Sequence, residues 1–559
     1  MILGFARQPV RHVLLKNNYL LRYKYSTSAS EAPPIKPGFK RGENVVAKRP
    51  LDFDDVSASF ATKSDYEILR SIIVFKLCGI EFFVKNANRL LKLGDKIIGQ
   101  RITNLIMKKT FFAHFCAGED SETIKPVIKK LENAGLGAVL DYAAEADVPE
   151  TPTERKEGVV SARTYEYTDE ASCDANLEIC LSCIEASANR PDSFAAIKLT
   201  ALGKPELLEH LSTVLNHTKK VFQNFCESEQ DIVKMTELIN YEQFDRGLRA
   251  MNINLGTVKT RKLFDKMDAN KSGDVDFVEW INFLDPKLLG GLNPKFKTQG
   301  LKTLSEEEMQ QVRNLKKRLK LLADKAADLG VRLMVDAEQT YFQPAIDHFV
   351  LQLQRTYNRE RPVIYNTYQC YLKDSYDRIK IDLERARRDG FFFAAKCVRG
   401  AYMIQERARA RDRGYSSPIH NTIEETHANY HKCVDIVMDN IETCDLMIAS
   451  HNETTVKHVV QRMQELGIPI RGGGIYFGQL LGMCDHVSFS LGMSGYMAYK
   501  YVPYGPVHEV LPYLVRRAEE NSNMLGSAKK EIRLLQNELV RRRIRPLWKS
   551  GTGTVVQSQ

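Results

Sequence analysis

The twelve residues DANKSGDVDFVE, Asp268 to Glu279, have the residue types and spacing of a calcium-binding loop. Gly273 stands where such a loop turns sharply, and Val275 stands where it pairs with a neighbouring loop. The six ligand positions are filled by Asp268, Asn270, Ser272, Asp274 (through its backbone carbonyl), Asp276 and Glu279. This pattern predicts one Ca²⁺ site.

Calcium loops of this EF-hand type usually occur in pairs. The segment 232–243 aligns as a degenerate partner, with Lys234, Thr236 and Glu237 at ligand positions and no glycine at the turn, so we expect it to bind no metal. In such a pair Ile239 would lie opposite Val275. The sequence leaves open whether the module binds calcium or only packs on the rest of the protein, and it does not indicate that calcium regulates anything.

A second motif that could bind a ligand is the arginine pair Arg516 and Arg517, in the stretch LPYLVRRAEEN. Adjacent arginines on a helix usually form a solvated face. Here they follow the last of a series of apolar segments, and two guanidinium groups in a partly dry site would suit a carboxylate. The glycine-rich phosphate motifs and the H-E-x-x-H zinc motif are absent from the sequence.

Eight short apolar segments, each followed by a longer helix-like stretch, must position these residues. Such alternation is typical of parallel strands buried on both faces, and eight units predict a closed (β/α)₈ barrel with its active site at the carboxyl ends of the strands. The segments start at Gly137, Phe194, Val331, Pro362, Phe391, Asp445, Ile475 and Met497. Polar residues at or just past their ends are Lys198, Asp336, Glu338, Asn366, Lys396, Arg399, His451 and Gln479.

The predicted fold class is α/β: a distorted (β/α)₈ TIM-like barrel with an N-terminal helical region and an inserted helical EF-hand module. About 130 residues separate the second and third segments, far more than one crossover needs. The expected divisions are a leader 1–25, a linker 26–63, a helical region 64–135, a barrel 136–203 and 330–525, an insertion 204–329 and a basic tail 526–559.

Composition restricts the possible partners. The formal charge is +10, and five of these charges lie in residues 1–25, which contain no acid. This leader has the composition of a mitochondrial transit peptide, with a disordered basic tail as the alternative. No basic stripe predicts a nucleic-acid partner, and no apolar run is long enough to span a bilayer. The eleven cysteines are expected to be reduced, and Cys180 and Cys183 to face the core.

The chain resembles the mitochondrial proline dehydrogenases of animals. The matching stretches are VDAEQTYFQPAI, NTYQCYLKD, VRGAYMIQERARA, ASHNETT, YFGQLLGMCD, YKYVPYGPVHEVLPYLVRRAEEN, IKLTALGKP and LGAVLDYAAEA. The resemblance implies a barrel that holds FAD non-covalently, oxidises L-proline to Δ1-pyrroline-5-carboxylate and passes electrons to membrane quinone. It also implies a location on the matrix side of the mitochondrial inner membrane, as a peripheral protein.

The same resemblance implies individual roles. Arg516, Arg517 and Lys198 would bind the carboxylate, Asp336 and Tyr501 would line the pocket, and Tyr402 and Leu480 would wall the ring. Lys396 and Arg399 would contact the flavin, with Asn366, Gln369 and His451 as further flavin contacts, and Glu520 would orient Arg517. Bacterial relatives have arginine where Lys396 stands, so this residue keeps the charge and loses the bidentate fork.

Two alternatives stay open. Hydroxyproline-preferring relatives have a small residue in place of Tyr501, and a tyrosine there would crowd C4 of the ring, so proline is favoured over hydroxyproline. The other alternative is a calcium-binding regulatory protein with an inactive barrel. The basic tail could lie on an anionic membrane or be an ordinary solvated helix.

Overall fold

The computed structural model describes residues 36, 39–42, 47–143, 146–148, 162–164, 167–188, 192–226, 237–283, 304–523 and 525–549 of the 559-residue chain. The predicted leader and much of the predicted linker lie outside these residues. Among the described helices, none combines the length and the apolarity needed to cross a membrane.

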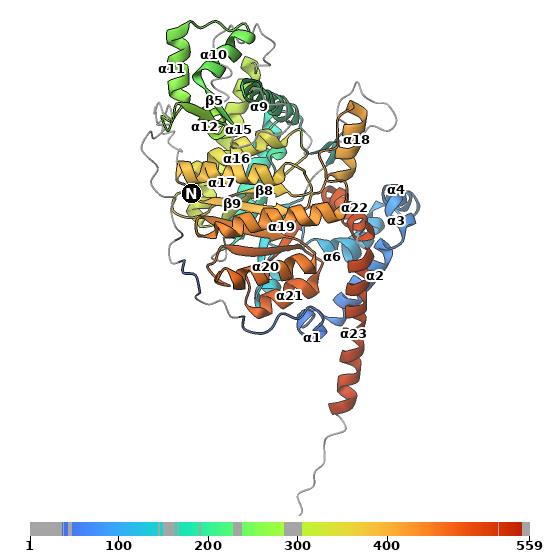
Figure 1. The fold of residues 1–559 in the computed structure, drawn as a ribbon. Helices are drawn as coiled ribbons and strands as arrows, with labels where there is room; N and C mark the ends of the chain where they lie inside the picture. Colours follow the sequence, from blue (N-terminus) through green and yellow to red (C-terminus); the bar gives the residue numbers. More distant parts are fainter. Residues whose placement is uncertain are drawn as a thin grey trace, which may run out of the picture.

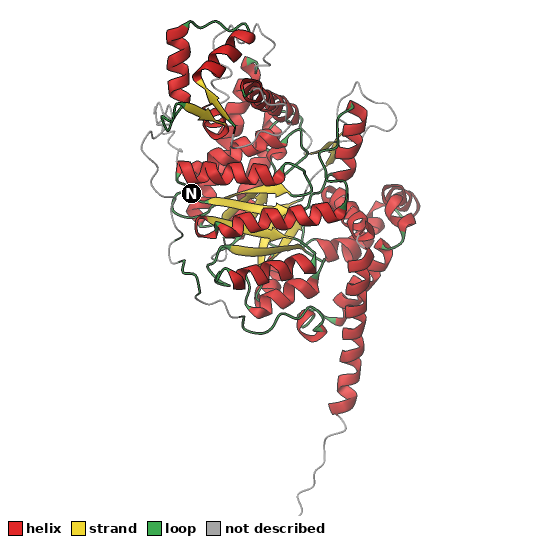
Figure 2. Ribbon diagram, in the orientation of Figure 1, coloured by secondary structure: helices red, strands yellow, loops and turns green. Residues whose placement is uncertain are grey.

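A closed barrel of eight parallel strands occupies the centre of the molecule (Figure 2). All eight apolar segments form its strands, so the predicted barrel is confirmed. In the order β1-β12-β11-β10-β9-β8-β7-β4 around the barrel, the strands are β1 (Gly137–Tyr142), β12 (Ala498–Tyr504), β11 (Ile475–Leu480), β10 (Cys444–Ala449), β9 (Phe393–Val398), β8 (Ile364–Gln369), β7 (Arg332–Val335) and β4 (Phe194–Ile197).

The amino end of the barrel is closed by aromatic side chains. Phe194, the first residue of β4, makes edge-to-face contacts with Tyr365, Tyr476 and Tyr499 at centroid distances of 5.5, 5.2 and 4.9 Å. All four side chains are at most 5% exposed. Because this plug fills the interior near the start of the strands, a ligand can enter the barrel only from the carboxyl end.

A layer of helices surrounds the strands, as expected for alternating β/α units (Figures 1 and 2). The helices that follow successive barrel strands are α8 (Glu170–Ser187), α9 (Pro205–Phe225), α16 (Gln343–Tyr357), α17 (Ser375–Asp389), α18 (Met403–Arg413), α19 (Ile423–Asp439), α20 (Glu453–Glu465), α21 (Asp485–Ser494) and α22 (Val507–Asn523). Cys183 on α8 is buried in the main core and Cys180 packs against it, as predicted, and all eleven cysteines are free thiols.

The inserted module is shorter than the predicted 204–329. The first half of α9 and all of α15 (Glu306–Leu329) belong to the helical layer, since Leu207, Leu211 and Leu319 lie in the barrel's core. A second core begins at Val221 and contains Phe244, Phe264 and Trp280. The module is built from the end of α9, β5 (Leu238–Asn240), α10 (Tyr241–Ala250), α11 (Thr257–Met267), β6 (Asp274–Asp276) and α12 (Phe277–Phe283).

The N-terminal helices lie across the barrel from this module (Figure 1). They are α1 (Val56–Ser59), α2 (Asp65–Cys78), α3 (Glu81–Lys85), α4 (Ala87–Ile97), α5 (Gln100–Met107), a π-helical turn η1 (Lys108–Phe112), α6 (Ala113–Phe115) and α7 (Lys125–Asn133). Val74, Phe112 and Phe115 share a core with Val510 and Leu514 of α22. These helices therefore cover the end of the barrel from which α22 starts.

The predicted tail forms a long helix, α23 (Leu525–Lys549). Its Leu534 and Leu535 are buried in a core with Ile68, Ile72 and Phe75 of α2. The apolar face of its described part therefore packs on the protein, which favours the structural interpretation of the tail over a membrane anchor.

Candidate functional site

Strand alternation decides which predicted residues face the barrel interior. Tyr365, Ala394, Tyr476 and Tyr499 lie in the interior cluster. Because successive side chains on a strand point to opposite faces, residues two or four positions later on the same strands also face inward. The predicted residues in this register are Gln369 on β8, Lys396 on β9, Leu480 on β11 and Tyr501 on β12.

The same rule places Asn366 and Gln479 on the outer face of the barrel. The side-chain amide of Asn366 donates to Asp347 of α16 at 3.0 Å, and that of Gln479 donates to the backbone carbonyl of Ser450 at 3.1 Å. Ser488 of α21 donates to the Gln479 side chain at 2.9 Å. Asn366, predicted as a flavin contact, is therefore turned away from the barrel mouth, and strand alternation is the physical reason.

Asp336 is the centre of a buried charged cluster at the carboxyl ends of the strands. It follows β7 directly, and its carboxylate forms an ion pair with the ammonium of Lys396. Lys198, which follows β4, approaches the other carboxylate oxygen at 3.5 Å, and the Tyr501 hydroxyl donates to that oxygen at 2.8 Å. Three residues predicted for the substrate pocket thus converge with Lys396 from four different strands.

The protonation of this cluster follows from its charges. Burial alone would raise the pKa of Asp336, but the charges of Lys396 and Lys198 and the hydrogen bonds from Lys396 and Tyr501 hold the pKa below its usual value. Burial, with the carboxylates of Asp141 and Asp336, raises the pKa of Tyr501. Asp336 is therefore ionised and Tyr501 is a neutral hydrogen-bond donor near neutral pH.

Asp141 belongs to this cluster and was missed at the sequence level. It lies on β1, is 4% exposed, and its carboxylate lies 3.8 Å from the Lys198 ammonium. The contact exists because β1 and β4, the first two strands of the barrel, pair side by side. The segment GAVLDYA did contain a signal, since an acid inside an apolar strand needs a partner when buried.

The arginine pair lies on α22, which follows β12. Arg516 and Arg517 are 6% and 8% exposed, so neither belongs to a solvated helix face. Arg517 donates to the Glu520 carboxylate at 2.6 Å, which is the contact expected of an orienting group, and its guanidinium also lies 4.8 Å from the centre of the Tyr513 ring. A side chain held at both points has little freedom left to lose when it binds a ligand.

Arg517 is within electrostatic range of both sides of the barrel mouth. Burial raises the pKa of the Cys116 thiol, the charge of Arg517 opposes this rise and that of Asp141 adds to it, so both charges act on the same thiol. Burial lowers the pKa of His451 to about 3, and the charges of Lys500, Arg517 and Arg399 contribute to this shift. Arg517 and Arg399 are thus both within electrostatic range of His451.

Arg399 and His451 form the second half of this mouth. The Arg399 guanidinium donates to the hydroxyls of Ser450 at 2.6 Å and Thr455 at 2.9 Å and to the ring of His427 at 3.1 Å. The two hydroxyls and the imidazole are neutral partners, so the cation retains capacity for an anionic group. His451 accepts a hydrogen bond from the backbone N–H of Leu480 at 3.0 Å, so its own proton resides on Nδ1.

The donors at this mouth fit a flavin with an anionic diphosphate chain. Beside Arg399 and His451, the side chain of Gln369 donates to the Glu338 carbonyl at 2.8 Å and accepts from the backbone N–H of Ala401 at 3.3 Å. Gln339 is completely buried, and neither polar atom of its amide has a hydrogen-bond partner among the described residues. A buried amide of this kind is available to a bound group.

The two predicted wall residues also lie at the carboxyl end of the barrel. Tyr402 precedes α18 and is 4% exposed, and its hydroxyl lies 3.5 Å from the Ala337 carbonyl oxygen, next to Asp336. Leu480 ends β11 and packs against the core shared by α2, α6 and α22. Lys500, on the outer face of β12, is fully buried and pairs with Asp485 at 2.7 Å, so it supports α21 and does not line the pocket.

The predicted calcium loop has the expected backbone but not a confirmed metal site. β5 and β6 pair antiparallel, with Ile239 opposite Val275 as predicted, and Gly273 has a φ of 91°. The Asp268 carboxylate accepts from the backbone N–H groups of Ser272 and Gly273, both at 2.9 Å. Among the described residues, no group of three or more His, Cys, Asp and Glu side chains is arranged to hold a metal ion.

The remaining loop acids have other partners. Asp276 pairs with Arg388 of α17 at 2.6 Å, and Glu279 accepts from the backbone N–H groups of Ala269 and Asn270 at 3.1 and 3.2 Å. Most of the predicted partner loop, including Lys234 and Thr236, lies outside the described residues.

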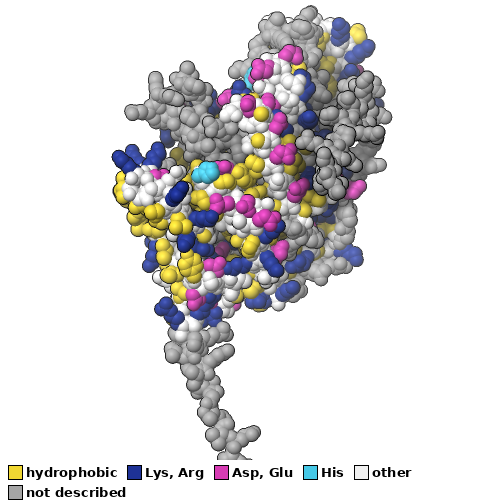
Figure 3. Space-filling model, turned by 180° about the vertical axis from the view of Figure 1, so that it is seen from behind, with side chains coloured by type: hydrophobic (Ala, Val, Ile, Leu, Met, Phe, Trp, Pro, Cys, Tyr) yellow, Lys and Arg dark blue, Asp and Glu magenta, His cyan; other side chains and the backbone are white. Residues whose placement is uncertain are grey.

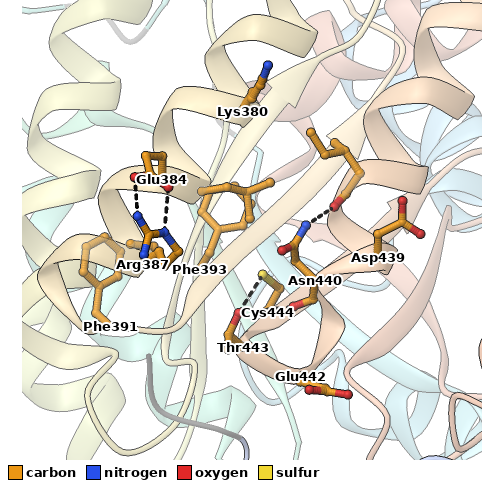
Figure 4. A pocket seen from close by; sticks show the side chains of 13 residues that line it. Lys380, Glu384, Arg387, Phe391, Phe393, Asp439, Asn440, Glu442, Thr443 and Cys444 are labelled. Atoms are coloured by element: carbon orange, nitrogen blue, oxygen red, sulfur yellow. Dashed lines mark hydrogen bonds and ion pairs between the residues drawn. The ribbon is translucent and has the colours of Figure 1, made fainter. Parts of the chain in front are cut away.

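A pocket between α17 and α19 lies at the opposite end of the barrel (Figure 4). It is lined by Phe391 and Phe393 at the start of β9 and by Cys444 at the start of β10, and Arg387 is held there by Glu384. None of the predicted site residues contributes to it, so it is separate from the mouth.

A closed parallel barrel with a buried charged site at the carboxyl ends of its strands defines a (β/α)₈-barrel enzyme. The family model described as proline dehydrogenase matches residues 124–530. Proline dehydrogenase 1, mitochondrial, from Homo sapiens is 41% identical, covering 91% of this chain and 93% of the relative. The chain therefore belongs to the proline dehydrogenase family of flavin-dependent oxidoreductases.

Other relatives agree with this assignment. Proline dehydrogenase 1, mitochondrial, from Drosophila melanogaster is 38% identical over 89% of this chain and 82% of its own length. Hydroxyproline dehydrogenase from Xenopus laevis is 33% identical over 91% and 94%. The crystal structure of proline utilization A from Bdellovibrio bacteriovorus has a TM-score of 0.50 at 18% identity, covering 84% of this chain and 38% of that one, and supports the fold.

Proposed function

We propose that the protein oxidises L-proline to Δ1-pyrroline-5-carboxylate with bound FAD and passes the electrons to a membrane quinone, on the matrix side of the mitochondrial inner membrane. The observation that carries the proposal is the buried cluster of Lys198, Asp336, Lys396 and Tyr501, together with the buried arginine pair on α22, the helix that follows β12. The names of the relatives from Homo sapiens and Drosophila melanogaster support the mitochondrial location.

The charges of the mouth suit a small zwitterion. The cations Lys198, Lys396, Arg516 and Arg517 outnumber the carboxylates Asp141, Asp336 and Glu520. Because these groups are largely buried, an added carboxylate would interact with the arginines and Lys198 with little screening by water. We assign carboxylate binding to Arg516, Arg517 and Lys198.

The bound flavin supplies the acceptor for a hydride from the carbon beside the amine nitrogen. That step requires the nitrogen lone pair, so the amine must react unprotonated. Cations around the substrate's carboxylate favour loss of the amine proton and hold the ring in one orientation. Arg399, His451 and Gln369 are the residues of this chain that we assign to holding the flavin. Asp336 would keep Lys396 and Tyr501 in place beside the flavin.

L-Proline is favoured over hydroxyproline. Tyr501 faces the pocket, and its hydroxyl is held by Asp336 at 2.8 Å, so the ring cannot swing away to admit a larger substrate. Identity also favours proline: proline dehydrogenases match at 38–41% and hydroxyproline dehydrogenases at 31–33%. A calcium-binding protein with an inactive barrel is disfavoured, because it would have no use for a buried cluster of competent charged groups.

Anaerobic titration of the purified protein tests the activity. We expect a yellow protein whose flavin absorbance is bleached by L-proline and is bleached much less by trans-4-hydroxy-L-proline. A colourless protein that cannot be loaded with FAD, or a flavin that L-proline leaves oxidised, would exclude the proposal.

We further propose that the loop Asp268–Glu279 binds one Ca²⁺. Support comes from the complete set of ligand types, the paired β5 and β6 strands and the positive φ of Gly273. Binding would require Asp276 and Glu279 to exchange their present partners for the ion. Because Asp276 is paired with Arg388 of the barrel helix α17, this exchange would reach the helical layer.

Calorimetry tests the calcium proposal. We expect one Ca²⁺ per chain in the wild type and none in Glu279→Gln, which loses the charge of the twelfth position. Asp265→Asn, on the exposed side of α11, is the matched control and should bind as the wild type does. Heat of binding that is equal in Glu279→Gln and wild type would show that this loop is not the site.

A further inference from the structure

The helical hairpin α4–α5 presents an apolar face to the outside of the molecule. Six of the twenty-one large hydrophobic side chains that are exposed among the described residues fall between Leu93 and Ile106, and three more lie at the neighbouring α3. The most exposed of them, Ile97, is 70% exposed. In Figure 3 these helices form the apolar region at the left edge of the molecule, with lysine and arginine side chains around it.

The apolar side chains are not exposed merely because the buried face of the helix has no room for them. In α5 the buried side chain is Thr103, while Ile102, Leu105 and Ile106 point outward. A helix whose outer surface faced water would have the opposite arrangement. In α4, Leu93 and Ile97 are one turn apart and both exposed, so this helix also presents apolar side chains to the outside.

The charge around this face is strongly positive. Residues 76–109 contain eight basic side chains, among them Lys92, Lys96 and Arg101, against the two acids Glu81 and Asp95. An apolar face bordered by lysine and arginine is complementary to a bilayer with anionic headgroups, where the apolar side chains enter the acyl boundary and the cations contact phosphate.

The hairpin is also close to the proposed electron path. α3, α5 and η1 each contact α22, the helix that carries Arg516 and Arg517. A membrane bound to the hairpin would therefore lie beside the barrel mouth, where a quinone dissolved in that membrane could reach the flavin.

We infer that the outer face of α4 and α5 is the membrane-docking surface of this protein and that it binds anionic phospholipid bilayers. The basic tail is then not the docking surface. The inference rests on the proposed function for its link to quinone. It differs from the usual expectation for a basic C-terminal helix, because the apolar side of α23 is occupied by α2.

Vesicle co-sedimentation of the full chain tests the inference. For the variant Ile97→Glu/Ile102→Glu/Ile106→Glu, the partition coefficient into vesicles that contain cardiolipin should be lower than that of wild type by a factor of about ten or more. The control Val258→Glu/Leu321→Glu/Ile423→Glu changes equally exposed apolar residues elsewhere and should bind as wild type. Lys92→Gln/Lys96→Gln/Arg101→Gln should lose binding to cardiolipin vesicles and differ little from wild type on phosphatidylcholine vesicles.

Activity separates this inference from the proposed function. With a soluble dye as acceptor, the Ile97→Glu/Ile102→Glu/Ile106→Glu variant should oxidise L-proline at the wild-type rate, and with quinone embedded in vesicles it should be slower. Equal vesicle binding by wild type and this variant would overturn the inference, even if L-proline is oxidised. So would a wild type that stays in solution, or a wild-type dimer that this variant converts to monomers without changing vesicle binding.

Discussion

Replacement of Arg517 by methionine tests how the substrate is held. The side chain is 8% exposed, so its bond to a carboxylate is poorly screened, and removing one partner of such a pair costs about 2–4 kcal/mol. At about 1.4 kcal/mol per factor of ten, kcat/KM for L-proline should fall about 30- to 700-fold. Methionine keeps most of the apolar volume, so the fold should be preserved.

Prolinamide turns this loss into a specific test. It has the ring and amine of proline without the carboxylate, so Arg517→Met should lower kcat/KM for L-proline far more than for prolinamide. Arg533→Met, an exposed arginine on α23, is the matched control and should change neither. Equal losses for both substrates would refute the assignment of Arg517 to carboxylate binding.

Three further outcomes follow from the same structure. Tyr501→Ser should raise the ratio of kcat/KM for trans-4-hydroxy-L-proline over L-proline about tenfold; an unchanged ratio would discredit the assignment of Tyr501 to specificity. Asp336→Asn should lower the free energy of unfolding at pH 7, measured in urea, by about 3 kcal/mol, since Lys396 and Lys198 lose their shared carboxylate; an unchanged midpoint would show that the ion pairs contribute nothing. Glu453, bonded to His486 and Lys530 at 3.0 and 2.8 Å, has its pKa lowered to about 2. A depressed carboxyl pKa stabilises the fold above the ordinary value of 4.5, and this stabilisation is lost as the pH falls through the folded-state value. The free energy of unfolding of Glu453→Gln should therefore be about 2 kcal/mol lower than that of wild type at pH 7. This difference should shrink as the pH approaches 2. A difference that stays constant across this pH range would contradict the linkage.

Much of the fold was predictable because its signals are local. Each apolar segment is long enough for one strand and is followed by a helix-like stretch, so the eight-stranded barrel follows from the order of elements alone. The pairing of Ile239 with Val275 was also predictable, since position within a calcium loop determines position in the short sheet.

Side-chain direction at the strand ends was predictable only in part. Residues 366 and 369 lie on the same strand and both seemed to be cofactor contacts, yet their separation of three places them on opposite faces. Counting alternation from Tyr365 would have excluded Asn366. The contact of Asp141 with Lys198 could not be found this way, because it depends on the register between the first and second barrel strands.

Exposure of the hairpin could not be predicted from its pattern. The spacing of Ile102, Leu105 and Ile106 indicates an amphipathic helix, and such a helix normally buries that face. Only the three-dimensional packing shows that Thr103 faces inward and the apolar residues face outward. The same limitation applied to α23, whose apolar face looked available and is in fact covered by α2.

A crystal structure of the FAD-loaded protein with cyclopentanecarboxylate, which has the ring and acid group of proline and no amine, tests the central claim most directly. We expect the carboxylate about 3 Å from the guanidinium groups of Arg516 and Arg517 and from the Lys198 ammonium, with the ring between Tyr501 and the flavin. A ligand bound at the mouth with its carboxylate away from all three cations would contradict the account.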